Sequence, residues 1–176
     1  MLRNIRKSNI GVTAAICAAA AVTVLTATPA GAATITYNVT SNCWNYSSHC
    51  SGNEVVDDPL YVNYHSVSTS GDGNPSGSFA EFYGNVSNYG SETSHSENTD
   101  YVYHYVYLSG YGDGSGQAVK NNAASANNCS TVNGYRIYFY SGYGGHSQSI
   151  PHYFSCASST NLDSTLKNNN ASQHFA

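Results

Sequence analysis

Charged side chains are scarce in this sequence. Only 9% of its 176 residues are Asp, Glu, Lys or Arg, against roughly 25% in an average soluble domain. This scarcity excludes a coiled coil, and six basic residues are too few for the clustered Lys and Arg of a nucleic-acid binder. A sustained helical period is also missing from every segment, so helices are not expected to form the core.

Tyrosine and small polar residues make up the composition instead. The chain contains 16 Tyr and 16 Gly, and its polar residues are mainly Ser, Asn and Thr. Aromatic residues favour half-buried strands, while Gly, Asn and Ser favour tight turns. The composition therefore predicts one small all-β domain.

The first 32 residues are expected to be a secretory signal. Three basic residues within the first seven positions precede an apolar run at Gly11–Leu25, and the small residues Ala30–Ala32 follow. A membrane anchor is the alternative, but no stop-transfer charges follow the run. Cleavage after Ala32 would leave three basic residues against ten acids, a formal charge of −7. We therefore expect an extracellular monomer that binds neither nucleic acid nor membranes.

The four cysteines beyond the signal predict two disulfides, because an even number is typical of an exported chain. We favour Cys43 with Cys50, which closes a short loop, and Cys129 with Cys156, which brackets a hairpin-like segment. The sequence leaves the other two pairings open. Zinc is not expected, because no Cys-x-x-Cys pair occurs.

Two segments have the alternation of a strand. Tyrosines alternate with mostly aliphatic residues from 101 to 108, and residues 135–140 alternate before a Gly-rich turn at 141–145. A run of turn-forming residues at 68–75 marks a boundary, so we expect an N-terminal extension at 33–74 and a domain at 75–176. Short strands and Gly-rich turns predict a Greek-key sandwich.

A repeated pattern resembles the Greek keys of βγ-crystallins. Its spacing is aromatic, four residues, aromatic, one residue, Gly; the second copy has Asn at the second aromatic position. The matching residues are Tyr138, Tyr143 and Gly145 in one copy and Tyr83, Asn88 and Gly90 in the other. In that family the aromatic side chain covers a folded hairpin, and the Gly adopts backbone angles that a side chain would make costly. The resemblance implies a βγ-crystallin-like Greek-key β-sandwich preceded by the extension.

An Asn-rich segment follows each copy and resembles the calcium loops of the same family. The matching residues are Asn121, Asn122 and Ser125 in one segment and Asn168, Asn169 and Ser172 in the other. Every matching position that could carry a carboxylate holds Asn, so the resemblance implies at most weak calcium binding. Local hydrogen bonds from Asn and Ser to the backbone are the alternative role.

The chain is still more similar to secreted bacterial peptidase inhibitors of βγ-crystallin type, which are related to metalloproteinase inhibitors. The similarity is carried by residues 75–79, 116–125, 141–145 and 166–172, although Ala80 stands where that group often has Cys. It implies stoichiometric blockade of an extracellular peptidase, without turnover and without a required cofactor. The loop from Cys43 to Cys50 could supply the rigid, exposed segment, with Trp44 and Tyr46 as anchors.

No recognisable catalytic frame occurs in the sequence, so we expect no enzyme and no catalytic residues. Three other functions remain open. The protein could be a structural or binding module, weakly stabilised by calcium; it could bind glycans through the tyrosines at 101–107 together with Trp44; or it could resemble the killer-toxin-like proteins of the same fold.

Overall fold

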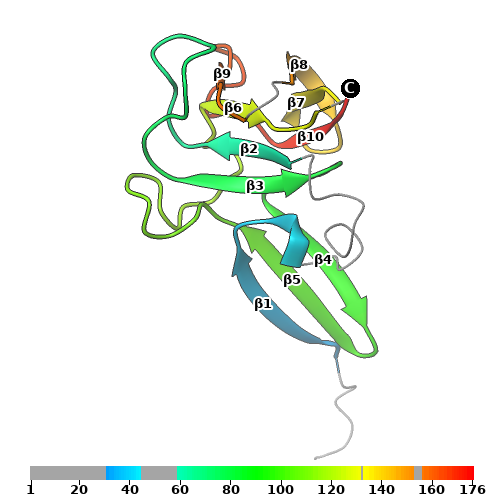
Figure 1. Ribbon diagram of the computed structural model, residues 1–176. Coiled ribbons are helices and arrows are strands. Elements are labelled where there is room, and N and C mark those ends of the chain that lie inside the picture. Colours follow the sequence, from blue (N-terminus) through cyan, green and yellow to red (C-terminus); the bar gives the residue numbers. More distant parts are fainter. Residues whose placement is uncertain (1–30, 45–58, 132, 153–155) are drawn as a thin grey trace, which may run out of the picture. The chain divides into compact units, whose positions relative to one another are not determined.

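A computed structural model describes the chain at residues 31–44, 59–131, 133–152 and 156–176 (Figure 1). The prediction of an all-β chain is confirmed, since these residues form strands and one short 3-10 helix, η2 (Asn42–Trp44), but no α-helix. The strands are β1 (Ala33–Val39), β2 (Pro59–Asn63), β3 (Phe79–Tyr83), β4 (Ser91–Ser96), β5 (Thr99–Tyr105), β6 (Ser125–Asn128), β7 (Tyr135–Tyr140), β8 (Gly144–Ile150), β9 (Thr160–Asn161) and β10 (Ser172–Phe175). Nothing helical in the described ranges is both long enough and apolar enough to cross a membrane.

The strands form three sheets, with the orders β3-β2-β6-β9, β10-β7-β8 and β1-β5-β4. Residues 34–176 form one compact unit. The boundary expected near residue 75 falls between β2 and β3, which pair along their whole length in a single sheet. Of the expected signal, residues 1–30 lie outside the described residues.

One apolar core joins all three sheets. Alternate residues of β2, β3 and β7 point into it, as the two-residue period of a strand requires. The buried core residues are Leu60, Val62, Ala80, Phe82, Val86, Tyr89, Tyr105, Tyr107, Val119, Ala123, Ala126, Tyr135, Ile137, Ile150, Leu162 and Leu166. Bulky aromatic rings therefore fill much of the space that aliphatic residues occupy in most small domains.

The four-stranded sheet and the sheet β10-β7-β8 have similar strand pairings. In one, β2 pairs with β3 on one side and with β6 on the other; in the other, β7 pairs with β8 and β10 in the same antiparallel way. One further segment before each returning strand pairs with the other of these two sheets. Strand β9 pairs with β6, and Val86 forms a bridge with Gln173 of β10. The pairing around β2 thus resembles the pairing around β7.

The third sheet carries the predicted row of tyrosines. Tyr105 of β5 and Tyr107 just beyond it are fully buried, whereas Tyr101 and Tyr103 are only half-buried. Tyr103 stacks on Tyr37 of β1, with ring centroids 5.5 Å apart. The row therefore divides between core packing and a small exposed aromatic surface.

Candidate functional site

The two Asn-rich loops lie side by side and bond to each other reciprocally. The amide of Asn121 donates to the carbonyl of Asn170 at 2.8 Å, and the amide of Asn168 donates to the carbonyl of Ala123 at 2.9 Å. Asn121 and Asn168 both have positive φ, 63° and 59°, which Asn tolerates better than most residues. Asn121 and Asn168, which occupy equivalent positions in the two loops, thus make equivalent backbone hydrogen bonds.

The two serines of these loops are also equivalent. The hydroxyl of Ser125 donates to the carbonyl of His65 at 2.7 Å, and that of Ser172 donates to the carbonyl of Tyr140 at 2.7 Å. The amide of Asn122 donates through Nδ2 to Ala118. These bonds are the local backbone-stabilising role that Asn and Ser side chains commonly take.

A shallow cavity flanks each loop, and the residues that line them do not fit calcium. A divalent cation prefers about six to eight oxygens that include carboxylates, but no carboxylate is among the described residues that line either cavity. Each cavity is lined instead by one lysine, Lys120 in the first and Lys167 in the second. The ammonium of Lys120 donates to Asn88 Oδ1 at 3.0 Å and to Ser141 Oγ at 2.9 Å, so a fixed positive charge already occupies these oxygens.

We therefore expect millimolar calcium to leave the melting temperature of the protein unchanged. A cation that binds only the folded state raises the melting temperature through linkage, but the lysines oppose its entry here. Differential scanning calorimetry with and without calcium, with magnesium as the control, measures this. A calcium-specific rise in the melting temperature would contradict the lysine argument.

The two copies of the aromatic pattern occupy different structures. Tyr138 and Tyr143 lie on the β7–β8 hairpin with ring centroids 6.0 Å apart. Gly145 has φ +77°, and a Cβ there would lie 2.8 Å from Tyr140 Cδ2, so glycine is required for this turn. Tyr83 ends β3 and Gly90 precedes β4, strands of different sheets, and the φ of Gly90 is not in the left-handed range.

Residues 40–43 cover the free edge of β3. The amide of Glu81 donates to the carbonyl of Thr40 at 3.0 Å. The side chain of Asn42 makes two bonds with the backbone of Tyr83, accepting at 2.8 Å and donating at 2.7 Å. Cys43, which is disulfide-bonded, follows directly. The base of the expected inhibitory loop is thus fixed to the sheet, up to Cys43; the side chain of Trp44, the first predicted anchor, lies outside the described part of the chain.

The remaining predicted residues of that loop lie outside the described part of the chain. These are Tyr46 and Cys50, the partner expected for Cys43. The second predicted disulfide is present, and it joins Cys129 to Cys156. It ties the end of β6 to the segment that leads into β9.

Three histidines pair with aspartates on the surface. His65 contacts Asp113, His95 contacts Asp100 and His146 contacts Asp163, at 3.3, 2.7 and 2.7 Å between nitrogen and carboxylate oxygen. The hydrogen bond from His146 holds the pKa of Asp163 below its ordinary value. Within the described ranges, no group of three or more His, Cys, Asp or Glu is placed to hold a metal ion.

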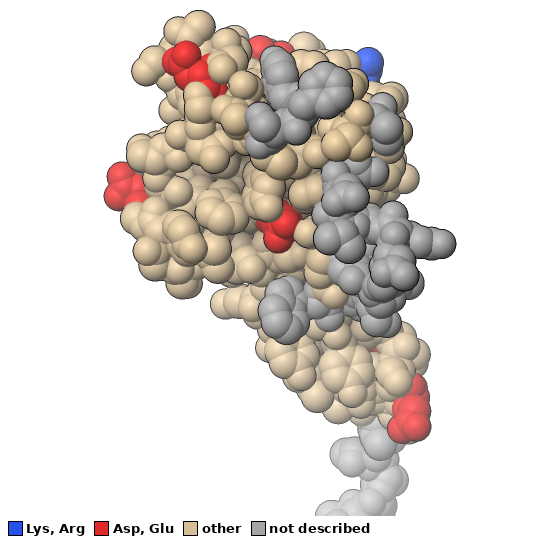
Figure 2. Space-filling view, viewed as in Figure 1, with Lys and Arg blue, Asp and Glu red and all other residues tan. Residues whose placement is uncertain are grey.

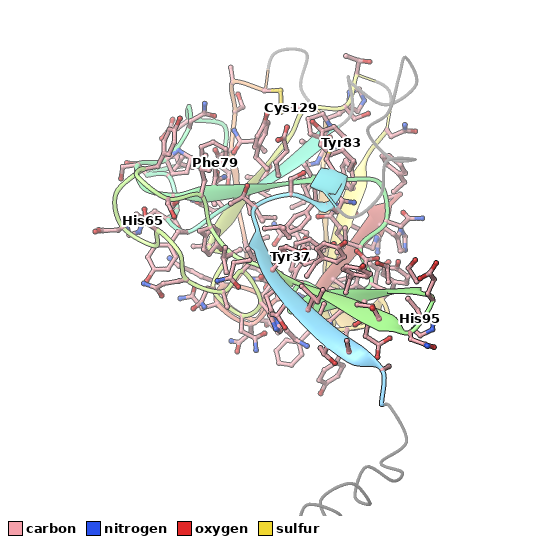
Figure 3. All side chains as sticks on the ribbon, turned by 90° about the horizontal axis from the view of Figure 1, so that it is seen from below. Tyr37, His65, Phe79, Tyr83, His95 and Cys129 are labelled. Carbon is pink, nitrogen blue, oxygen red and sulfur yellow. A yellow bond between two sulfur atoms is a disulfide. The ribbon has the colours of Figure 1, made fainter. Side chains whose placement is uncertain are left out.

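Sequence reasoning missed an aromatic and polar surface on the face of the four-stranded sheet that points away from the core. Tyr61, Phe79 and Tyr83 lie there, Phe79 and Tyr83 at opposite ends of β3 (Figure 3). The hydroxyls of Tyr61 and Tyr83 both donate to Glu81 Oε1, at 3.0 and 2.7 Å. Burial, together with Glu81, raises the pKa of Tyr61 to about 12 and that of Tyr83 further still.

Charged side chains are few on the face of the molecule shown in Figure 2, and the acidic ones lie in separate places. Alternation along β3 could have predicted that Glu81 shares a face with Phe79, but not that Tyr61 joins them. Their meeting depends on the pairing of β2 with β3 across a long loop, which alternation alone does not give.

Neither the protein-family models, nor the curated proteins, nor the solved structures compared with this chain match it.

Proposed function

We propose that this protein is an exported, non-catalytic domain of βγ-crystallin type that blocks an extracellular peptidase stoichiometrically. The observation that carries the proposal is the anchoring of residues 40–43 along β3. An inhibitor needs a segment that is already rigid, so that little conformational entropy is lost on docking. Two side-chain bonds from Asn42 and a disulfide at Cys43 fix one end of the loop in this way.

The similar pairings around β2 and β7 support the βγ-crystallin part of the proposal. A Greek key places its fourth strand beside its first, and β10 returns beside β7 while β9 crosses to the other sheet. The first half follows the same path, with β6 returning beside β2. The reciprocal bonds between the two Asn-rich loops relate the halves to each other.

Titration of a metallopeptidase of thermolysin type and a serine peptidase of subtilisin type with the oxidised protein tests the proposal. We expect the activity of one of them to reach zero near one molecule of inhibitor per enzyme. Trp44→Ala should weaken inhibition by about thirtyfold or more, the effect of losing an interface anchor. Tyr140→Ala, a change at an exposed ring distant in sequence from the loop, is the matched control and should leave inhibition unchanged.

Full activity of both peptidases at a large excess of intact protein would refute the inhibitor proposal. Equal potency of Trp44→Ala and the unchanged protein would refute the loop assignment. The chain would then still be all-β, and we would propose that it is a structural or binding module.

A further inference from the structure

A groove of about 280 Å³ opens on the outward face of the four-stranded sheet. It is lined by Tyr61, Asn63, Asn74, Phe79, Asn127 and Cys156. Residues 64–78, which connect β2 to β3, and the segment that precedes β9 fold over one end of this face. They hold each other through the amide of Gly71, which donates to Ser159 at 2.8 Å, and that of Ser159, which donates to Asp72 at 2.9 Å.

The floor of the groove is a fixed network of amide side chains. Asn127 is 2% exposed, and its Oδ1 accepts from Asn63 Nδ2 and from Ser159 Oγ, both at 2.7 Å. Its Nδ2 donates to Asn74 Oδ1 at 2.7 Å and to the carbonyl of Cys156 at 3.2 Å. Asn127 is therefore fully bonded, and it orients the amides of Asn63 and Asn74.

Two atoms of this network remain free to bind a ligand. Asn63 is only 6% exposed. Both of its side-chain hydrogen bonds are made by Nδ2, so its Oδ1 has no partner in the described part of the chain. Asn74 uses its Oδ1 in the network, and its Nδ2 likewise has no described partner. The groove thus presents one fixed acceptor, Asn63 Oδ1, and one donor, Asn74 Nδ2.

Aromatic rings and a carboxylate complete the groove. The rings of Tyr61 and Phe79 meet edge to face with centroids 5.4 Å apart, and the ring of Tyr111 meets Phe79 in the same way at 5.4 Å. Glu81, which Tyr61 contacts, accepts both tyrosine hydroxyls at Oε1. Its Oε2 makes no bond within the described residues and adds a second acceptor next to the groove.

We infer that this groove binds one ring of a neutral oligosaccharide. Sugar hydroxyls both donate and accept, which matches Asn63 Oδ1, Asn74 Nδ2 and Glu81 Oε2, while the apolar face of a sugar packs on Phe79 and Tyr61. Among the described residues that line the groove none is charged, and the adjacent Glu81 carboxylate would repel an anionic ligand. Its volume is near the lower end of the range for ligand sites, about 300 Å³, which suits a single ring.

Nuclear magnetic resonance on the oxidised, ¹⁵N-labelled protein tests this inference without any substitution. The probes are N-acetylchitohexaose, cellohexaose and xylohexaose at millimolar concentration, with an uncharged hexapeptide of Gly, Ser and Asn as the competing class. We expect one oligosaccharide to shift the side-chain amide signals of Asn63, Asn74 and Asn127 in a saturable way. Unmoved signals with all three sugars, or shifts produced by the peptide in their place, would overturn the inference.

Two variants then locate the site by calorimetry with the sugar that binds. Phe79→Ala and Asn74→Ala should each weaken binding by about tenfold or more, as the loss of a central contact does. Tyr37→Ser, which alters the exposed aromatic surface of the third sheet, is the control and should leave the affinity within about twofold. Unchanged affinity in both groove variants, or a loss in the Tyr37 variant alone, would place the sugar elsewhere and refute the assignment.

Discussion

Phe82→Ala is expected to lower the free energy of unfolding by about 3–5 kcal/mol, as truncation of a buried aromatic ring does. Phe82 is fully buried. Its ring stacks on that of Tyr89 with centroids 5.1 Å apart and meets the ring of Tyr105 edge to face at 5.0 Å. Removal of the ring leaves a cavity between two rings whose own positions are fixed, so the core cannot close around it.

Urea denaturation of the purified variant measures this loss. Tyr111→Ala is the matched control, because it removes an aromatic ring at a position that is 56% exposed, and its cost should be far smaller. Equal losses in the two variants would mean that Phe82 does not hold the core together. A Phe82→Leu variant, which keeps most of the volume, should recover much of the lost stability.

Removal of the Cys129–Cys156 disulfide is expected to cost about 3–4 kcal/mol, or roughly 10 to 15 °C in melting temperature. The bond spans a sequence separation of 27, so its loss frees a long loop in the unfolded chain. It also releases the segment after Cys156 from β6. The carbonyl of Cys156, which accepts from Asn127 at 3.2 Å, would lose its fixed position.

The double variant Cys129→Ala and Cys156→Ala isolates this effect, since both cysteines go together and no free thiol is left. Calorimetry compares its melting temperature with that of the oxidised parent. Reduction of the parent, which also opens the disulfide at Cys43, should lower the melting temperature at least as far. A double variant that melts with the parent would contradict the expected role of this bond.

Local patterns predicted individual strands well. Residues 135–140 alternate, and β7 has those bounds; the tyrosines from 101 onward lie on β5 and beyond it. Alternation is a property of the chain itself and requires no knowledge of the partner strand. The hairpin-like segment between Cys129 and Cys156 likewise predicts a disulfide between them, and this disulfide is present.

Pairing between distant segments could not be predicted in this way. The turn-rich run after residues 59–63 is typical of a linker, so the sequence predicts that these residues belong to an extension. They form β2 instead, which lies between β3 and β6 in the four-stranded sheet. The spacing of the second aromatic pattern predicts a folded hairpin after Tyr83, like the hairpin after Tyr138. Strand β3 ends at Tyr83 and pairs instead with β2, which precedes it in the sequence. The groove depends on the same long-range pairing, so no local signal in Tyr61 or Phe79 could have revealed it.

The reciprocal bonds between the two Asn-rich loops tie two distant parts of the chain to each other. Each loop supplies the carbonyl that the other loop needs, through Asn170 in one direction and Ala123 in the other. Neither loop can keep its full set of backbone hydrogen bonds alone, so the two are expected to open and close as one cooperative unit.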